Sequence, residues 1–244
     1  MERTLIASPR RFARVTGLFY ALMMVIGGLG GFARNGLIMK GDAVATATQI
    51  VAHQSMWRLG FTFDVLMVLS YVVAVAMLYR LFRPVSRNLT VVAVCLGIMG
   101  CTIQSLAYVF EYCPLLVLGG ASYLSVFTAS QLQALAYLFI RLYSQTYGAA
   151  LVFFACYCLL NGYLILKSTF LPRFVGVLLM VAGGGWLIFL WPSLGARLLN
   201  PYLMVTGVGE GVLVLWLLVF GVDPQRWNEQ ARAAGDLPDA PDAS

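Results

Sequence analysis

Long apolar runs separated by short polar linkers make up most of the chain. About six of these runs reach roughly 20 residues, the length at which an α-helix crosses the hydrocarbon core of a bilayer. The pattern therefore predicts an all-α fold, a polytopic transmembrane helix bundle with about six spans. The predicted spans are residues 16–32, 59–81, 89–110, 147–166, 174–191 and 202–221.

Two segments between the spans are too long to be simple turns. In the first, GDAVATATQIVAHQ, Asp42 can cap a helix on which Asp42, Thr46, Gln49 and His53 share one face. We expect an amphipathic helix on the outer side, lying over the bundle. The second segment, residues 113–146, is apolar but interrupted by Gln and Arg. There we expect a re-entrant, interfacial or short extra helix, and the distribution of arginines favours one that does not cross fully.

Composition assigns the chain to the integral membrane proteins. Of its 244 residues, 61% are hydrophobic and 11% are charged, and the mean hydropathy is +0.84. No water-soluble core of this size requires so apolar a chain. We expect a cytoplasmic N-terminal arm at residues 1–15 and a single transmembrane helical domain at residues 16–222. The Pro-, Ala- and Asp-rich end of the chain predicts a disordered cytoplasmic tail at residues 223–244.

The basic residues indicate topology and not nucleic-acid binding. The formal net charge is +6 and the isoelectric point is near 9.2, but the arginines flank apolar segments and form no stripe with interleaved aromatics. With six spans they all fall on one side, which places both termini in the cytoplasm by the positive-inside bias. These residues are Arg3, Arg10, Arg11, Arg14, Arg80, Arg83, Arg87, Lys167, Arg173, Arg226 and Arg232.

One carboxylate, Asp64, lies about two turns inside the second predicted span. A charge at that depth costs roughly 2.5 to 3.5 kcal/mol on insertion scales, so it needs a partner, a watery cavity or a bound proton. Two arginines, Arg34 and Arg58, are candidates to neutralise it. If one of them does so, Asp64 holds helices together, and otherwise it is a proton-holding acid.

Depth along the spans places Asp64, Gln104, Glu111 and Glu210 at one level in the outer half of the bundle. We expect a polar, carboxylate-lined cavity at this level, where two carboxyl groups would retain a proton between them. Asp64 and Glu210 are therefore the candidate catalytic residues. The candidate substrate-binding residues lie on polar faces of the spans: Tyr20, Arg34, Arg58, Tyr71, Gln104, Tyr108, Glu111, Phe154, Tyr157 and Asn161.

The residue types and motifs of the sequence give little support for a bound metal ion or cofactor. The chain has one histidine, His53, which excludes bis-histidine haem, histidine-box di-iron and the common zinc sets. A carboxylate-rich metal site on His53, Asp42, Glu111 and Glu210 stays a minor alternative. Its five cysteines are expected to be packing thiols, and no phosphate-binding loop or dinucleotide turn is present in the sequence. We therefore predict no metal and no cofactor.

Three motifs of the sequence are fairly specific: the GDA-with-TA loop in GFARNGLIMKGDAVATATQIVAHQ, the RLGF segment, and the GE-with-LWLL motif in GEGVLVLWLLVFGV. Through these motifs the chain resembles the bacterial membrane proteins grouped as domain-of-unknown-function family 4386. The similarity covers residues 14–222, and Asp42, Arg58, Asp64 and Glu210 fall on its motif positions. It implies a multi-pass fold in a bacterial inner membrane and brings no agreed activity.

A looser similarity concerns placement alone. Asp64 and Glu210 occupy places similar to the acidic residues of small integral-membrane terpene cyclases, which are thought to begin cyclisation by protonating an epoxide or alkene, although local sequence does not match. Tyr20, Tyr71 and Phe154 are among the aromatic residues that could face a developing carbocation.

Three functions follow from these residues. The first is an intramembrane enzyme that acts by acid–base chemistry on an isoprenoid or lipid-like substrate, with membrane lipids and a hydrophobic small molecule as partners. The second is a proton-coupled transporter of a small amphipathic molecule. The third is a binding or scaffold protein in which the carboxylates only hold helices together. No internal repeat supports the second, and a carrier would be expected to show one.

Overall fold

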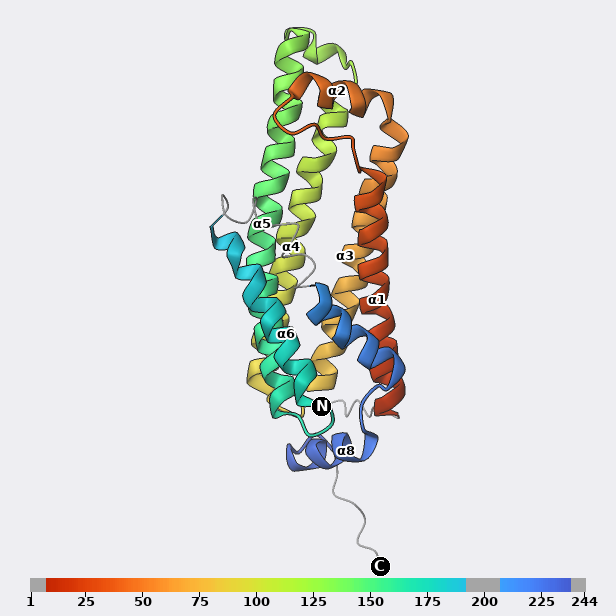
Figure 1. Cartoon of the computed structure of the whole chain (residues 1–244), viewed down its shortest axis with the longest axis vertical. Helices are drawn as coiled ribbons and strands as arrows, with labels where there is room; N and C mark the ends of the chain where they lie inside the picture. The colour runs from red at the N-terminus through yellow and green to blue at the C-terminus, as the bar shows by residue number, and fades with distance from the viewer. Residues whose placement is uncertain (1–7, 192–206, 238–244) are drawn as a thin grey trace, which may run out of the picture. The chain divides into compact units, whose positions relative to one another are not determined.

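The structure is a computed structural model that describes residues 8–191 and 207–237, and regular structure in these ranges is entirely helical, as predicted (Figure 1). The elements are α1 (Pro9–Ala33), α2 (Ala43–Ala52), α3 (Gln54–Phe82), α4 (Arg87–Val117), η1 (Ser122–Leu124), α5 (Ala129–Lys167), α6 (Arg173–Trp186), η2 (Leu187–Leu190), the helix Gly207–Val219 and α8 (Pro224–Ala233).

Five of the described helical stretches are long and apolar enough to cross a membrane: α1, α3, α4, α5, and α6 together with η2. They contain the first four predicted spans and the fifth up to Leu190, and they confirm a multi-pass membrane protein. The helix Gly207–Val219 gives a sixth span if it is counted with α8, to which it is bent by 102°. The start of the predicted sixth span, residues 202–206, lies outside the described residues.

The segment at residues 113–146 differs from expectation. α4 continues through Pro114 to Val117, and Ala129–Lys167 is one unbroken helix of 39 residues that includes the predicted fourth span. Between Ala129 and Tyr147 the sequence contains no Gly or Pro, so nothing ends the helix there. The prediction of a re-entrant, interfacial or separate short helix is therefore wrong, because α5 extends over ~58 Å at the usual helical rise.

The C-terminal segment also contains more structure than its composition indicates. Asp223 caps α8 by accepting hydrogen bonds from the main-chain N–H groups of Gln225 (3.0 Å) and Arg226 (3.2 Å), and Pro224 occupies the first turn. The indole of Trp227 is buried and donates to the carbonyl of Leu81 (3.0 Å). The prediction of a disordered tail from residue 223 is thus wrong for α8, and residues 238–244 lie outside the described part.

The short helix α2 forms where Asp42 was expected to cap it, with the Asp42 carboxylate accepting from the N–H of Ala45 (2.8 Å). In Figure 1 it runs crosswise to α3. Its buried side chain Ile50 belongs to an apolar core with residues of α3, α4, α5 and the α1–α2 connection. That core consists of Leu37, Ile50, Trp57, Leu115 and Ile140.

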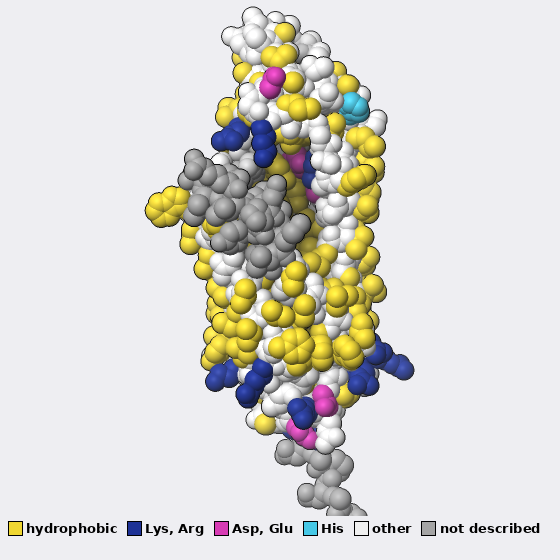
Figure 2. All heavy atoms as spheres, in the orientation of Figure 1, with side chains coloured by type: hydrophobic (Ala, Val, Ile, Leu, Met, Phe, Trp, Pro, Cys, Tyr) yellow, Lys and Arg dark blue, Asp and Glu magenta, His cyan; other side chains and the backbone are white. Residues whose placement is uncertain are grey.

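The chain divides into two compact units, and α1, α3, α4 and α5 each contribute a part to both. Unit 1 comprises Met1–Ala21, Tyr71–Gly100 and Leu151–Ser244, and unit 2 comprises Leu22–Ser70 and Cys101–Ala150. Every described basic residue that indicated topology, from Arg10 to Arg232, belongs to unit 1. Figure 2 shows Lys and Arg side chains gathered at the end of this unit that carries α8, beside a surface dominated by hydrophobic side chains.

Candidate functional site

Arg34 is the centre of a buried ionic group in unit 2. Its Nη1 lies 2.5 Å from Oδ2 of Asp64 and its Nη2 donates to Oδ1 at 3.3 Å, so the two side chains pair through two nitrogens and two oxygens. Arg34 Nε lies 2.6 Å from Oε1 of Glu111. Asp64 and Glu111 are only 2% and 1% exposed. We call these three residues the Arg34 cluster.

Helix ends and glycines bring the Arg34 cluster together. Arg34 directly follows the last residue of α1, whereas Asp64 and Glu111 lie within α3 and α4. A Cβ atom on Gly30 would lie 2.8 Å from Oδ1 of Asp64, and one on Gly60 would lie 2.6 Å from Nη1 of Arg34. These distances are too short for any side chain, so glycine at both positions leaves the space that the ion pair occupies.

The Arg34 cluster has one cationic group for two carboxyl groups, which also neighbour each other. Burial lowers the pKa of the Arg34 guanidinium, but Glu111 and Asp64 raise it by more, so the pKa lies above its ordinary value and Arg34 stays charged. Among the described residues, no N–H or hydroxyl group donates to Oε2 of Glu111, and the neighbouring carboxyl group of Asp64 can share a hydrogen bond with Glu111 only when one of the two is protonated. The surplus carboxyl group and this oxygen of Glu111 are the unusual features of the site.

Aromatic side chains surround the Arg34 cluster. Tyr108, Tyr143 and Tyr147 pack with ring centroids 5.8 to 6.3 Å apart, and Tyr108 and Tyr143 lie close enough to Asp64 and Glu111 to interact with them electrostatically. Gln104 donates from Nε2 to the Tyr108 hydroxyl (3.1 Å). In Figure 2, acidic and basic side chains are visible inside a hollow of the otherwise apolar face.

Three residues near the Arg34 cluster are missing from the sequence-based candidates. Trp57 donates from its indole nitrogen to the main-chain carbonyl of Glu111 (2.9 Å), and Tyr143 and Tyr147 come from the first part of α5. The spacing of four between Tyr143 and Tyr147 was a usable signal, because it puts both rings on one helical face. It was overlooked because residues 113–146 were separated from the fourth span.

The structure also decides between the two candidate partners of Asp64. Arg34 binds it, whereas Arg58 is exposed and donates from Nη1 to the hydroxyl of Tyr112 at 3.2 Å. Arg58 follows Trp57 near the beginning of α3, a turn and a half before Asp64, and it points to a different partner. The arginine from the α1–α2 connection therefore neutralises the intramembrane aspartate.

Glu210 is held in unit 1 by a second set of residues. Its Oε1 accepts a hydrogen bond from the indole of Trp186 (2.8 Å), and its Oε2 accepts one from the hydroxyl of Tyr20 (3.2 Å). The thiol of Cys158 donates a longer, weaker one to Oε1 (3.8 Å). Glu210 is half-buried, and Trp186 and Tyr20 are buried. We call these four residues the Glu210 group.

An aromatic stack continues from the Glu210 group. Tyr71 lies with its ring centroid 5.6 Å from Tyr20, 4.8 Å from Phe154 and 6.2 Å from Tyr157. Asn161, another candidate, donates from Nδ2 to the main-chain carbonyl of Tyr157 (2.8 Å), so its amide supports its own helix. All of these rings are buried, and their packing forms much of the interior of unit 1.

The candidate residues from the sequence thus divide between two groups. Arg34, Arg58, Asp64, Gln104, Tyr108 and Glu111 belong to unit 2, and Tyr20, Tyr71, Phe154, Tyr157, Asn161 and Glu210 belong to unit 1. Asp64 and Glu210, expected as one acid–base pair, are each held by partners of their own unit. Within the described ranges, His, Cys, Asp and Glu form no group of three or more that could hold a metal ion.

Comparison with known proteins gives a family and no activity. The family described as "Domain of unknown function (DUF4386)" matches residues 15–221, which include every residue of the Arg34 cluster and the Glu210 group. No curated protein and no solved structure matches the chain significantly. Because the match covers most of the sequence, as the GDA, RLGF and GE motifs indicated, the chain belongs to the DUF4386 family.

Proposed function

We propose that this multi-pass membrane protein binds a small amphipathic cation in exchange for a proton held by the Arg34 cluster. The observation that supports the proposal is the ratio of cationic to acidic groups in the Arg34 cluster. One guanidinium faces two buried carboxyl groups, and no N–H or hydroxyl group in the described part of the chain donates to Oε2 of Glu111.

Charge balance explains why a proton belongs there. With both carboxyl groups ionised, the cluster would bear one net negative charge in a medium of low dielectric constant, which is strongly unfavourable. A proton on Glu111 makes the cluster neutral, because Arg34 already holds both oxygens of Asp64. A cation that reached Glu111 would neutralise it equally well, so the proton and the cation compete for one carboxyl group.

The surroundings of the Arg34 cluster favour an organic cation over a hydrated metal ion. Tyr108 and Tyr143 supply aromatic faces, which attract ammonium-type cations at a desolvated site. Metal ions of the hard class need several oxygen ligands, and two carboxyl groups that share an arginine offer too few. A proton-coupled carrier was the second function inferred from the sequence, and this proposal assigns its binding site to the Arg34 cluster.

An enzyme that protonates an isoprenoid or lipid-like substrate is the second candidate. The observation in its favour is the aromatic stack of Tyr20, Tyr71 and Phe154 beside Glu210, which could stabilise a carbocation. It is less well supported, because each proposed acid is already engaged. Asp64 has both oxygens on Arg34, and Glu210 accepts from Trp186, Tyr20 and Cys158.

The test uses the full-length protein in lipid nanodiscs with tetraphenylphosphonium, a lipophilic cation, as the probe. Binding is measured by calorimetry over a series of pH values, and proton release is measured in weak buffer. We expect one proton released per cation bound, with an affinity that rises up to about tenfold per pH unit while the proton is still bound. Glu111→Gln is expected to abolish both effects.

The matched control is Glu210→Gln, which removes a carboxylate of the other group and should leave proton release unchanged. A wild-type protein that binds the cation without releasing a proton would overturn the exchange. If the protein binds no cation and Glu111→Gln only lowers the unfolding temperature, the Arg34 cluster is a structural helix contact, and the proposal fails.

A further inference from the structure

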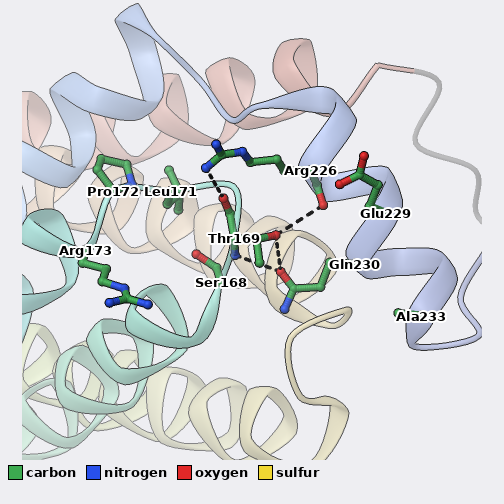
Figure 3. A pocket seen from close by; sticks show the side chains of 9 residues that line it. All are labelled: Ser168, Thr169, Leu171, Pro172, Arg173, Arg226, Glu229, Gln230 and Ala233. Carbon is green, nitrogen blue, oxygen red and sulfur yellow. Dashed lines mark hydrogen bonds between the residues drawn. The ribbon is translucent and has the colours of Figure 1, made fainter.

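A second site lies in unit 1, at the end of this unit where the Lys and Arg side chains gather (Figure 2). A pocket of about 760 Å³ opens between the α5–α6 connection and α8. The connection contributes Ser168 and Thr169 to its lining, the start of α6 contributes Arg173, and α8 contributes Arg226, Glu229 and Gln230, as Figure 3 shows. The Arg34 cluster and the Glu210 group contribute nothing to it, so this site requires an explanation of its own.

Hydrogen bonds make the pocket a built feature of the fold. Thr169 donates from its main-chain nitrogen and from its hydroxyl to Oε1 of Gln230, both at 3.0 Å. Arg226 donates from Nη1 to the main-chain carbonyl of Thr169 (3.3 Å). Trp227, on the same helix, is buried and bonds to α3 through the carbonyl of Leu81. The two walls are therefore held together by contacts that leave the space between them open.

The charge of the lining favours an anion. Two guanidinium groups, those of Arg173 and Arg226, line the pocket together with one carboxylate, that of Glu229. Arg226 also lies with its Nε 3.7 Å from Oδ2 of Asp223, an exposed carboxylate outside the lining. Glu229 is exposed and accepts a hydrogen bond from Gln225 on its own helix (3.1 Å), and Figure 3 shows it on α8 away from Arg173. Arg173 is exposed and makes no hydrogen bond or ion pair within the described residues, so its guanidinium is available to a ligand.

The depth of the pocket relative to the apolar surface indicates where that anion comes from. Arg173 is the first residue of α6, and the next residue, Phe174, is 49% exposed on the membrane-facing helix. The exposed rings of Phe174 and Phe220 pack on either side of the half-buried Trp216, with centroid distances of 5.4 Å for Phe174–Trp216 and 4.5 Å for Trp216–Phe220. Tryptophan is enriched at the level of lipid headgroups, so Trp216 favours a position of the pocket near that level.

We propose that the pocket between the α5–α6 connection and α8 binds the phosphate headgroup of an anionic phospholipid. Arg173 and Arg226 contact the phosphate, and the acyl chains lie along the exposed apolar face of α6 at Val177 and Val181. A soluble phosphate compound would make the same ionic contacts but would gain nothing from this apolar face.

The test measures lipid binding by the full-length protein in detergent. Native mass spectrometry counts dioleoylphosphatidylglycerol molecules bound during a titration, with dioleoylphosphatidylcholine as the zwitterionic comparison. We expect roughly fivefold weaker phosphatidylglycerol binding in Arg173→Gln and roughly 30-fold weaker binding in Arg173→Gln/Arg226→Gln. Phosphatidylcholine binding should not change.

The control is Arg11→Gln/Arg87→Gln, which removes two exposed cations of the same unit outside the pocket and should weaken binding less than about twofold. Equal losses in the control and the pocket variant would mean diffuse attraction and overturn the pocket. Arg173→Gln removes no hydrogen bond between residues that the structure describes, so a change in its lipid binding at unchanged unfolding temperature reports the ligand alone. An excess of glycerol 3-phosphate that displaces the lipid completely would overturn the lipid assignment.

Discussion

Arg34 and Asp64 form a two-pronged ion pair in which Nη1 and Nη2 of the arginine meet Oδ2 and Oδ1 of the aspartate at 2.5 and 3.3 Å. Arg34 is still not saturated by this partner, because its third nitrogen, Nε, lies 2.6 Å from Glu111. The aspartate inside the membrane span is thus neutralised, and the surplus acid of the site is a glutamate on a different helix.

Arg34→Gln should be the most destabilising single substitution in the Arg34 cluster, because it leaves two buried carboxyl groups without a cation. We expect a loss of about 3 to 5 kcal/mol at neutral pH. Carboxyl groups without a cation are most stable when protonated, so the variant should regain stability as the pH falls and lose it as the pH rises. Thermal unfolding in detergent over a pH series measures this. The control is Arg58→Gln, because Arg58 is an exposed arginine of the same unit. The free energy of unfolding of this variant should stay within about 0.5 kcal/mol of the wild-type value.

Neutralising the two acids should show strong non-additivity. Either Asp64→Asn or Glu111→Gln leaves one carboxylate for Arg34. We expect each single variant to lose the free energy of one hydrogen bond and at most about 1 kcal/mol more in the free energy of unfolding. The double variant leaves Arg34 buried and unpaired, and we expect a cost of about 3 to 5 kcal/mol. A double-mutant cycle from chemical or thermal unfolding gives the coupling energy. Additive costs would show that both carboxylates are needed in their ionised form.

The glycines beside the ion pair should be intolerant of any side chain. Gly30→Ala and Gly60→Ala place a Cβ within 3 Å of Asp64 and Arg34, and we expect each to cost about 1 to 3 kcal/mol. Gly28 and Gly31 are matched controls on α1, because nothing lies within 4 Å of their added Cβ. Alanine there should be neutral, or stabilising by up to about 1 kcal/mol through helix propensity. Equal behaviour of the two pairs in unfolding experiments would contradict the close approach.

Trp186→Phe tests the Glu210 group. The substitution keeps an aromatic ring and removes the indole donor that binds Glu210 at 2.8 Å, so a buried carboxylate oxygen loses its strongest partner. We expect a loss of about 1 to 3 kcal/mol in the free energy of unfolding. Trp191→Phe, at a position 71% exposed, should have little effect. The same loss in both variants would mean that tryptophan size and not the hydrogen bond matters.

Hydrophobic periodicity identified five spans correctly, because the length of an apolar run is a direct requirement of the bilayer. The cap of α2 at Asp42 was equally predictable from local chemistry. The Asp223–Pro224 start of α8 has the same kind of signal, an N-cap acid followed by proline, but the composition of the last residues concealed it. The full length of α5 was missed because two polar side chains were taken as a boundary, whereas exposed Arg141 interrupts nothing.

Part of the Arg34 cluster and its surroundings was predicted from the sequence, but the pairing of the residues was not. Asp64, Glu111, Gln104 and Tyr108 were all found, because polar residues at helical spacing in an apolar span have few other roles. The choice of Arg34 over Arg58 depends on how the end of α1 approaches α3, and that depends on Gly30 and Gly60, whose spacing carries no signal of its own. Long-range helix contacts of this kind are not encoded in any local pattern.

The order of the Arg34 cluster along the chain has a consequence for biogenesis. Arg34 and Asp64 emerge first, and together they are electrically neutral, so α1 and α3 can enter the bilayer as a pair without an unmatched charge. Glu111 emerges only when α4 is nearly complete. A proton on Glu111, as the proposed function requires, would therefore be acquired during or after insertion of α4, when the third charged group of the Arg34 cluster has been synthesised.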